Sequence, residues 1–275
     1  MIGDRHENVI TDLPLGIRFF ESKVTTSGYV PFHWHNSIEV LCVLNGTLHL
    51  TIDGQLQVVN ANECIAISSG LVHDVTNTPN HAFVLQIPLQ ILNPFVENPR
   101  QLNFKMMRKK NPVSYQTVVD RFCLMNKFLQ QKKPGFLFDT EIVLIDLLKH
   151  LVMDFTEPTP LQSRINTSIR DMLSYINEHY KESLSVAKLA GLIGYNANYL
   201  SRLFRSQVGI SLVEYIYRVR LVKFHKELLE TDRSIADLMS EFGLTNERTS
   251  REMFYKIYKM LPLEARKNYH TMQAV

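Results

Sequence analysis

The sequence predicts an α+β protein. An N-terminal antiparallel β-barrel and a helical hairpin come first, and an all-α domain with two helix-turn-helix units joined by a long helix follows. Its 275 residues suffice for about two domains. The hydrophobic pattern has a strand-like period from Gly16 to Pro88 and a helical period from Val113 onward. With 45% hydrophobic and 21% charged residues, the composition is that of a folded chain.

Short runs of apolar and β-branched residues predict the strands of the barrel: Ile38–Leu44, Thr47–Ile52, Cys64–Ile67 and Phe83–Ile87. The residues that separate these runs are typical of turns, namely Asn45-Gly46, Asp53-Gly54, Ser69-Gly70 and Thr78-Pro79-Asn80. Asp53-Gly54 predicts a tight hairpin between Leu48–Ile52 and Leu56–Val59. Strands this short and closely spaced are typical of a small antiparallel barrel or sandwich.

Apolar residues at helical spacing predict two helices between Val113 and Phe155, separated at Lys132-Lys133-Pro134-Gly135. This pair could cover the barrel, contact a second subunit, or do both. The prolines in Thr156–Pro160 end the second helix and favour an extended chain. We therefore expect a first domain at 1–155, which also carries the dimer contacts, a linker at 156–166 and a second domain at 167–275.

Two similar helix pairs are predicted in the second domain. In the first, Ser185 caps a helix, Gly194 makes the turn, and Asn196 caps a helix that runs to Val208. In the second, Ser234 is the cap, Gly243 makes the turn, and Thr245 or Asn246 begins a helix that runs to Tyr258. A long helix over Ser211–Leu229 joins the pairs, and a stiff connection of this kind would fix their separation.

Charge and cysteine content exclude several classes of protein. From Gln162 onward the chain has 17 Lys/Arg against 12 Asp/Glu, and this basic part fits a polyanionic partner. Three widely spaced cysteines predict neither a disulfide framework nor a zinc finger, and we expect Cys42 and Cys64 to be small core residues. With no signal-like start and no apolar run of about 18 residues, we expect a cytoplasmic protein without a membrane segment.

The stretch SLSVAKLAGLIGYNANYLSRLFRSQVGISLVEYIYRVRLVKFHKELLETDRSIADLMSEFGL resembles the AraC/XylS family of bacterial regulators. About 100 residues share this similarity, which includes both helix-turn-helix units at their spacing. The resemblance implies activation or repression of transcription by binding promoter DNA, often under control of a small effector, with RNA polymerase as a partner. By motif match, Asn198, Ser201 and Arg202 would face bases, whereas Arg205 and Lys188 would contact phosphates.

The second unit departs from the family pattern. Leu244 replaces the usual Phe after the turn glycine, Ser250 occupies a core position, and Glu252 replaces an arginine. Lys259 stands where the family usually has a glycine. A carboxylate close to phosphates is repelled, so we expect this unit to bind DNA more weakly, with Arg248 and Arg251 as its best DNA-facing candidates.

His33, His35 and Glu39 share parity, so on a strand they project to one face, and His73 follows on a later strand. Together with Gly46, Gly70 and Asn77 they resemble the two cupin motifs, although Gly28 and Ser68 depart from that pattern. In cupin enzymes three histidines and a glutamate hold a divalent metal. Three interpretations stay open: a polar effector pocket, a site for iron, manganese, zinc or nickel, and an internal hydrogen-bond network.

Three hypotheses of function follow. The first is a homodimeric regulator controlled by a small effector, with a sugar as the first candidate. The others are a metal-dependent cupin enzyme with a DNA-binding appendage, and a regulator that needs no effector. Without a Ser-His-Asp set or a phosphate-binding glycine loop, we expect no enzyme activity and no cofactor apart from that divalent metal. Trp34 has the opposite parity to His33 and His35, and we expect it to pack outside the barrel.

Overall fold

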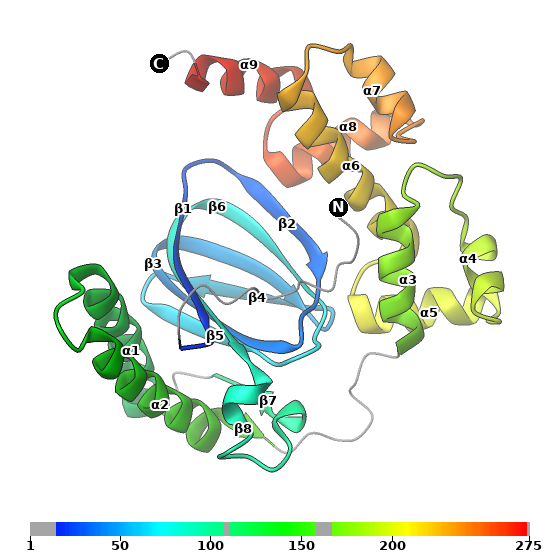
Figure 1. The fold of residues 1–275 in the computed structure, drawn as a ribbon. Helices are drawn as coiled ribbons and strands as arrows, with labels where there is room; N and C mark the ends of the chain where they lie inside the picture. The colour runs from blue at the N-terminus through cyan, green and yellow to red at the C-terminus, as the bar shows by residue number, and fades with distance from the viewer. Residues whose placement is uncertain (1–14, 107–110, 158–166, 274–275) are drawn as a thin grey trace.

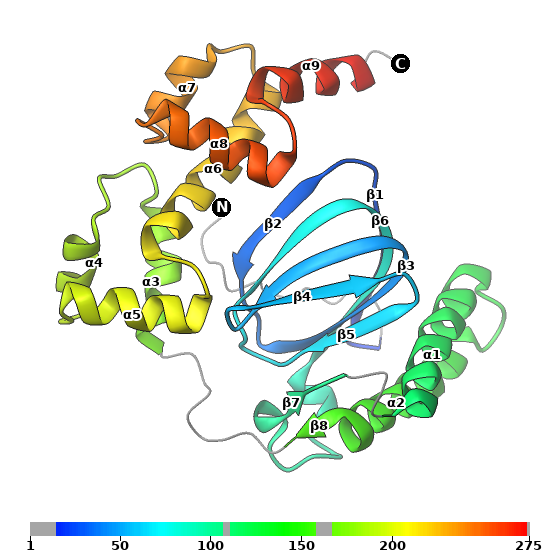
Figure 2. The same ribbon diagram turned by 180° about the vertical axis from the view of Figure 1, so that it is seen from behind.

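The computed structural model describes residues 15–106, 111–157 and 167–273 (Figure 1). A curled sheet lies in the middle of the molecule, with a helical hairpin on one side and the C-terminal helices on the other (Figures 1 and 2). The sheet contains β1 (Arg18–Val24), β2 (Gly28–His33), β3 (Ser37–Ile52), β4 (Gln55–Asn60), β5 (Glu63–Ile67) and β6 (His73–Pro88). Within these described residues no helix is long and apolar enough to cross a membrane.

Two long strands, β3 and β6, pair with each other along most of their length. β1 and β5 flank one half of this central pair, and β2 and β4 flank the other half. The antiparallel, cupin-like domain is therefore as expected. The predicted barrel is not closed, however, because the hydrogen-bonded ladders among the described strands leave the outer edges of these four short strands without a partner.

Two of the predicted turns are wrong. Asn45-Gly46 lies within β3 and Thr78-Pro79-Asn80 within β6, where the pairing register shifts on either side of Gly46. Gly46 has a φ of +79°, and a Cβ there would collide with the Pro79 carbonyl oxygen. This glycine therefore permits a bulge and a close backbone approach, which a sequence pattern does not distinguish from a turn. Asp53-Gly54 does form the expected hairpin between β3 and β4, with positive φ at both residues.

Cys42 and Cys64 lie opposite each other on β3 and β5 and form a disulfide. Both side chains are buried, as expected for core residues, but the prediction of no disulfide framework missed the bond between them. The two cysteines are 22 positions apart, and the segment between them forms the β3–β4–β5 meander. The strand register, which spacing alone does not give, brings them together.

The helical hairpin consists of α1 (Pro112–Gln131) and α2 (Phe136–Phe155). It packs on the sheet through a shared apolar core that includes Phe19, Phe83, Phe122 and Leu147. Short elements join it to the sheet: η1 (Leu89–Leu92), η2 (Pro99–Gln101), and the pair β7 (Asn103–Phe104) and β8 (Thr156–Glu157). Most of the predicted linker at 156–166 lies outside the described residues.

The C-terminal domain is entirely helical. It contains α3 (Thr167–Glu178), α4 (Val186–Leu192), α5 (Ala197–Val208), α6 (Leu212–Glu230), α7 (Ile235–Glu241), α8 (Glu247–Tyr258) and α9 (Pro262–Gln273). The expected caps are confirmed, because the side chains of Ser185, Asn196, Ser234 and Asn246 each accept a backbone N–H of the helix they begin. One apolar core surrounds α4 and α5, and a second surrounds α7 and α8, with α6 shared between them.

Candidate DNA interface and ligand site

The first recognition helix, α5, has a buried face and an exposed polar face. Leu200 and Phe204 are fully buried, whereas Asn198, Arg202 and Arg205 are exposed. Within the described part of the chain neither arginine forms an ion pair with an acid. An exposed helix that presents an amide and two uncommitted guanidinium groups has the donors needed to contact base edges and phosphates in a major groove.

Two other predicted DNA contacts in this unit have internal partners. The Ser201 hydroxyl donates to the Ala197 carbonyl at 2.9 Å. The Lys188 ammonium lies 2.9 Å from the Glu182 carboxylate. Both residues are close to the protein surface, but Lys188 must separate from Glu182 before it can contact a phosphate.

The second recognition helix, α8, corresponds to α5 at a distance of fifty positions along the chain, but its exposed face carries different residues. Glu252 stands at the position of Arg202, and it accepts a hydrogen bond from Arg248 at 2.9 Å. Arg251 donates to Glu247 at 3.2 Å. Both arginines that we expected to face DNA are therefore neutralised by acids of their own helix.

The four predicted ligand-site residues meet at one end of the sheet. His33 ends β2, opposite His73 at the start of β6, and Glu39 lies on β3. The Nδ1 atoms of His33, His35 and His73 lie 2.8–3.0 Å from the backbone carbonyls of Pro31, Ser37 and Leu71. A carbonyl only accepts, so these contacts favour the tautomer that carries its proton on Nδ1. One ring nitrogen of each histidine lies within 4.8 Å of a ring nitrogen of each of the other two.

Glu39 completes this cluster. Its carboxylate lies 3.3 Å from His35 Nε2 and 3.8 Å from His73 Nε2, and Gln86 donates to it at 2.7 Å. Burial opposes ionisation, but His35 and the other histidines outweigh it and lower the pKa of Glu39 to about 2. Burial, followed by the charge of His33, holds the pKa of His73 well below its usual range. At neutral pH the site therefore combines a carboxylate with a neutral imidazole.

These residues fit a divalent cation. A neutral imidazole with its Nδ1–H anchored on a carbonyl is the form in which histidine ligates a metal. The buried Nε2 of His73 has no hydrogen-bond partner among the described residues, and such a nitrogen is costly to bury unless something binds it. The ring centroids are only 4.2–6.0 Å apart, so the space suits an ion or one polar group of a larger ligand.

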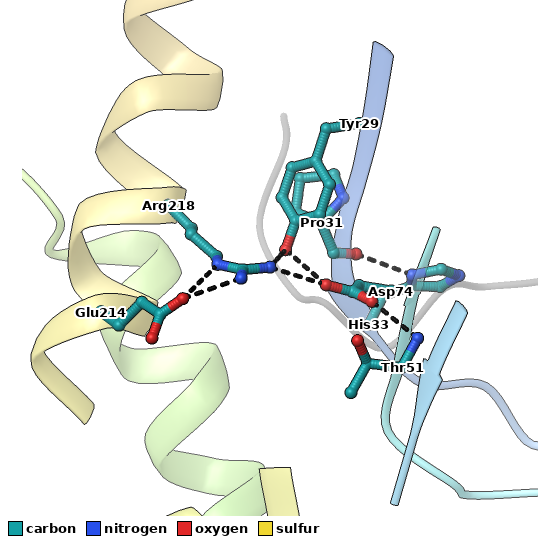
Figure 3. A network of polar contacts seen from close by, with 7 residues as sticks. All are labelled: Tyr29, Pro31, His33, Thr51, Asp74, Glu214 and Arg218. Carbon is teal, nitrogen blue, oxygen red and sulfur yellow. Dashed lines mark hydrogen bonds and ion pairs between the residues drawn. The ribbon is translucent and has the colours of Figure 1, made fainter. Parts of the chain in front are cut away.

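A buried polar network links this end of the sheet to α6 (Figure 3). Arg218 of α6 donates to the Asp74 carboxylate at 2.9 Å and to the Tyr29 hydroxyl at 3.1 Å, and Tyr29 also donates to Asp74. Asp74 follows His73 directly, and its other oxygen accepts the Thr51 backbone N–H. Burial raises the pKa of Asp74 in spite of these partners.

The sequence analysis did not predict this network. The charged residue Asp74, in the mostly apolar segment 71–75, could have indicated a buried ion pair, but its partner Arg218 is 144 positions away. Further contacts join the domains near α3 and α5. Arg170 lies over the Trp34 ring at 4.7 Å and donates to the Gly70 carbonyl, so Trp34 packs outside the sheet as expected. Gly54 lies against Gly209, too close for a side chain at either position.

Comparisons with known proteins agree with this architecture. A helix-turn-helix domain family matches residues 189–268, and a cupin domain family matches residues 21–87. An uncharacterised helix-turn-helix regulator of Bacillus subtilis, YdeC, is 22% identical over 95% of this chain and 94% of its own. The melibiose operon regulatory protein of Escherichia coli is 22% identical over 86% of this chain and 83% of its own.

The similarity is higher over the C-terminal domain alone. There the regulatory protein SoxS of Escherichia coli is 31% identical over 98 residues, which are 36% of this chain and 92% of SoxS. The paired helix-turn-helix units, the preceding cupin-like sheet and these relatives together place the chain in the AraC family of DNA-binding transcription regulators.

Proposed function

We propose that this regulator is controlled by a small ligand that binds at His33, His35, His73 and Glu39. The supporting observation is the convergence of three imidazole nitrogens, two of them on buried histidines, beside the buried carboxylate of Glu39. Imidazole nitrogens and a carboxylate held together in this way favour a ligand that supplies hydrogen-bond donors or positive charge. Sugar hydroxyls are donors, and a sugar remains our first candidate for the effector.

The route from this site to DNA runs through two strands. His73 is followed by Asp74 in β6, and His33 contacts the carbonyl of Pro31, two residues after Tyr29 in β2. Asp74 and Tyr29 both hold Arg218 (Figure 3). A ligand that draws His33 and His73 together would therefore move the groups that fix α6, the helix that joins the two recognition units. Such a ligand acts as a switch only if it favours one arrangement of the domains.

A divalent ion is the second candidate, favoured by the unpartnered Nε2 of His73. His33, His35 and His73 would ligate it with Glu39 as a fourth donor. A bound ion would supply a positive centre able to hold an oxygen of an organic effector. The alternative of a metal-dependent enzyme would require, in addition, a reaction on that effector.

On the DNA side we assign base contacts to Asn198, Ser201 and Arg202, and phosphate contacts to Arg205 and Lys188. Arg248 and Arg251 would make the weaker contacts of the second unit. We also propose a homodimer, because α2 exposes a stripe of large apolar side chains: Phe138, Ile142, Ile145 and Met153. Contact with RNA polymerase remains a prediction from the family.

Titration calorimetry on the full chain tests the ligand site, with a panel of sugars and with zinc, manganese, nickel and iron(II) salts. At least one ligand should bind saturably, change the affinity for promoter DNA in fluorescence anisotropy, and lose both effects in His73→Ala. The matched control is His150→Ala on α2, whose imidazole pairs with Asp154 outside the cluster. If His73→Ala and His150→Ala bind every ligand alike, the cluster is an internal hydrogen-bond network.

A further inference from the structure

A cavity lies away from the histidine cluster, between the sheet and the second helix-turn-helix unit. Its volume is about 710 Å³, and its walls come from β4 and β6 on one side and from α6 and α8 on the other. None of His33, His35, Glu39 and His73 lines it. Cavities of 300–1,000 Å³ are of the size that proteins use for small ligands.

Apolar side chains from both domains face this cavity. Leu56 on β4 is 67% exposed and Val213 on α6 is 52% exposed, and both line it together with Met253 and Ile257 of α8. Large aliphatic side chains left this exposed lose the free energy of burial, at about 25 cal/mol per Å² of apolar surface. Because several such side chains line one cavity between two domains, we expect the apolar part of a ligand to cover them.

The charge around the cavity is positive. Lys256 and Lys259, at the end of α8, line it, and among the described residues neither forms an ion pair with an acid. The acid of the lining, Glu214, is held by Arg218 at 2.8 Å and 3.1 Å. An anion entering the cavity would therefore meet two uncommitted ammonium groups and no uncommitted carboxylate of the lining.

We propose that this cavity binds a small organic anion with an apolar body. The apolar part would cover Leu56, Val213 and Met253, and the anionic group would lie at Lys256 and Lys259. This site shares no lining residue with the one proposed at the histidine cluster. Because its walls belong to both domains and include the second recognition helix, an occupant would link the N-terminal sheet directly to α8 and favour the docked arrangement of the domains.

The test uses 4-phenylbutyrate and its neutral amide, 4-phenylbutyramide, which have the same apolar body. In titration calorimetry on the full chain, the carboxylate should bind saturably and at least tenfold more tightly than the amide. The double variant Lys256→Ala/Lys259→Ala should weaken carboxylate binding at least tenfold, and Lys267→Ala, an exposed lysine on α9, should not. Leu56→Glu, which places a carboxylate in the apolar wall, should abolish it.

His73→Ala separates the two proposals, because it should leave 4-phenylbutyrate binding unchanged. Three results would overturn the cavity site: equal affinity for carboxylate and amide, unchanged affinity in the double lysine variant, or no saturable binding up to about 10 mM. Circular dichroism of each variant shows whether it is folded. The lysines and Leu56 are exposed, so we expect unaltered spectra.

Discussion

The two helix-turn-helix units have the same frame but different surfaces. Each recognition helix begins at an asparagine cap, Asn196 or Asn246, and buries a phenylalanine at the same position, Phe204 or Phe254. On the outer face, Arg202 in the first unit corresponds to Glu252 in the second. Positions that determine the fold have been kept, whereas positions available to DNA have changed. We therefore expect the first unit to bind DNA more tightly than the second.

Their contacts with the N-terminal domain differ as well. Phe32 and Val72 of the N-terminal domain belong to the apolar core of the first unit, next to Trp34. The second unit meets the sheet across the cavity and through Tyr29, which packs against the apolar core of that unit. The first unit joins the sheet through buried apolar side chains, whereas the second unit adjoins a cavity that a ligand can enter. The second unit is therefore the better placed of the two to respond to one.

The largest expected effect concerns the two buried phenylalanines. Phe204→Ala and Phe254→Ala should each lower the free energy of unfolding of their unit by about 3–5 kcal/mol, because each leaves a cavity in a closed core. Trp34, the only tryptophan, packs on the first core, so its fluorescence reports that unit. In urea, Phe254→Ala should lose helical circular dichroism before Trp34 fluorescence changes. In Phe204→Ala the Trp34 signal should change first; coincident transitions in both variants would show one cooperative unit.

Acid should distinguish the units in a second way. His225 on α6 stacks on Tyr258 of the second unit at 4.0 Å, and burial lowers its pKa to about 4. The unfolded chain binds this proton near pH 6.5 and the folded one does not. The neutral His225 therefore contributes its full share to the free energy of unfolding above pH 6.5. As the pH falls from 6.5 towards 4, the free energy of unfolding decreases by on the order of 2 kcal/mol. Thermal melts at pH 7 and pH 5 measure the loss, which His225→Phe should remove.

Arg202→Ala should reduce DNA affinity by about 1–3 kcal/mol if Arg202 contacts a guanine. Glu252→Ala should leave affinity equal or tighter, because it removes a charge that repels phosphates and frees Arg248. Fluorescence anisotropy with a promoter fragment at fixed salt compares the variants. A large loss of affinity in Glu252→Ala would mean that Glu252 itself contacts a base, such as a cytosine amino group, and that the second unit contributes more than its surface indicates.

The sequence predicted those parts of the fold that depend on neighbouring residues. Helix caps and turn glycines act within one turn of chain. Alternate parity predicted that His33, His35 and Glu39 would lie together; they do, although His33 ends β2 and Glu39 lies on β3 rather than on one strand. Contacts between distant segments were not predictable in this way. The disulfide of Cys42 needs the register of β5, and the Asp74–Arg218 pair needs the docking of two domains. A glycine such as Gly46 is equally compatible with a bulge and with a turn, so the sequence does not distinguish the two.

The smallest effect tests the end of the second recognition helix. Lys259 has a φ of +57°, in the left-handed region where Gly209 ends the first recognition helix at +83°. A left-handed conformation costs a residue with a side chain about 1–2 kcal/mol, and replacing it by glycine removes this cost. Part of the gain is lost again because glycine has more conformational freedom in the unfolded chain. Lys259→Gly should therefore stabilise the protein by about 0.5–1 kcal/mol in urea denaturation. The same variant should bind 4-phenylbutyrate more weakly, since the ammonium group is gone. Higher stability with weaker ligand binding would show that Lys259 is kept for its charge rather than for the fold; lower stability would mean that its side chain makes contacts that the helix end needs.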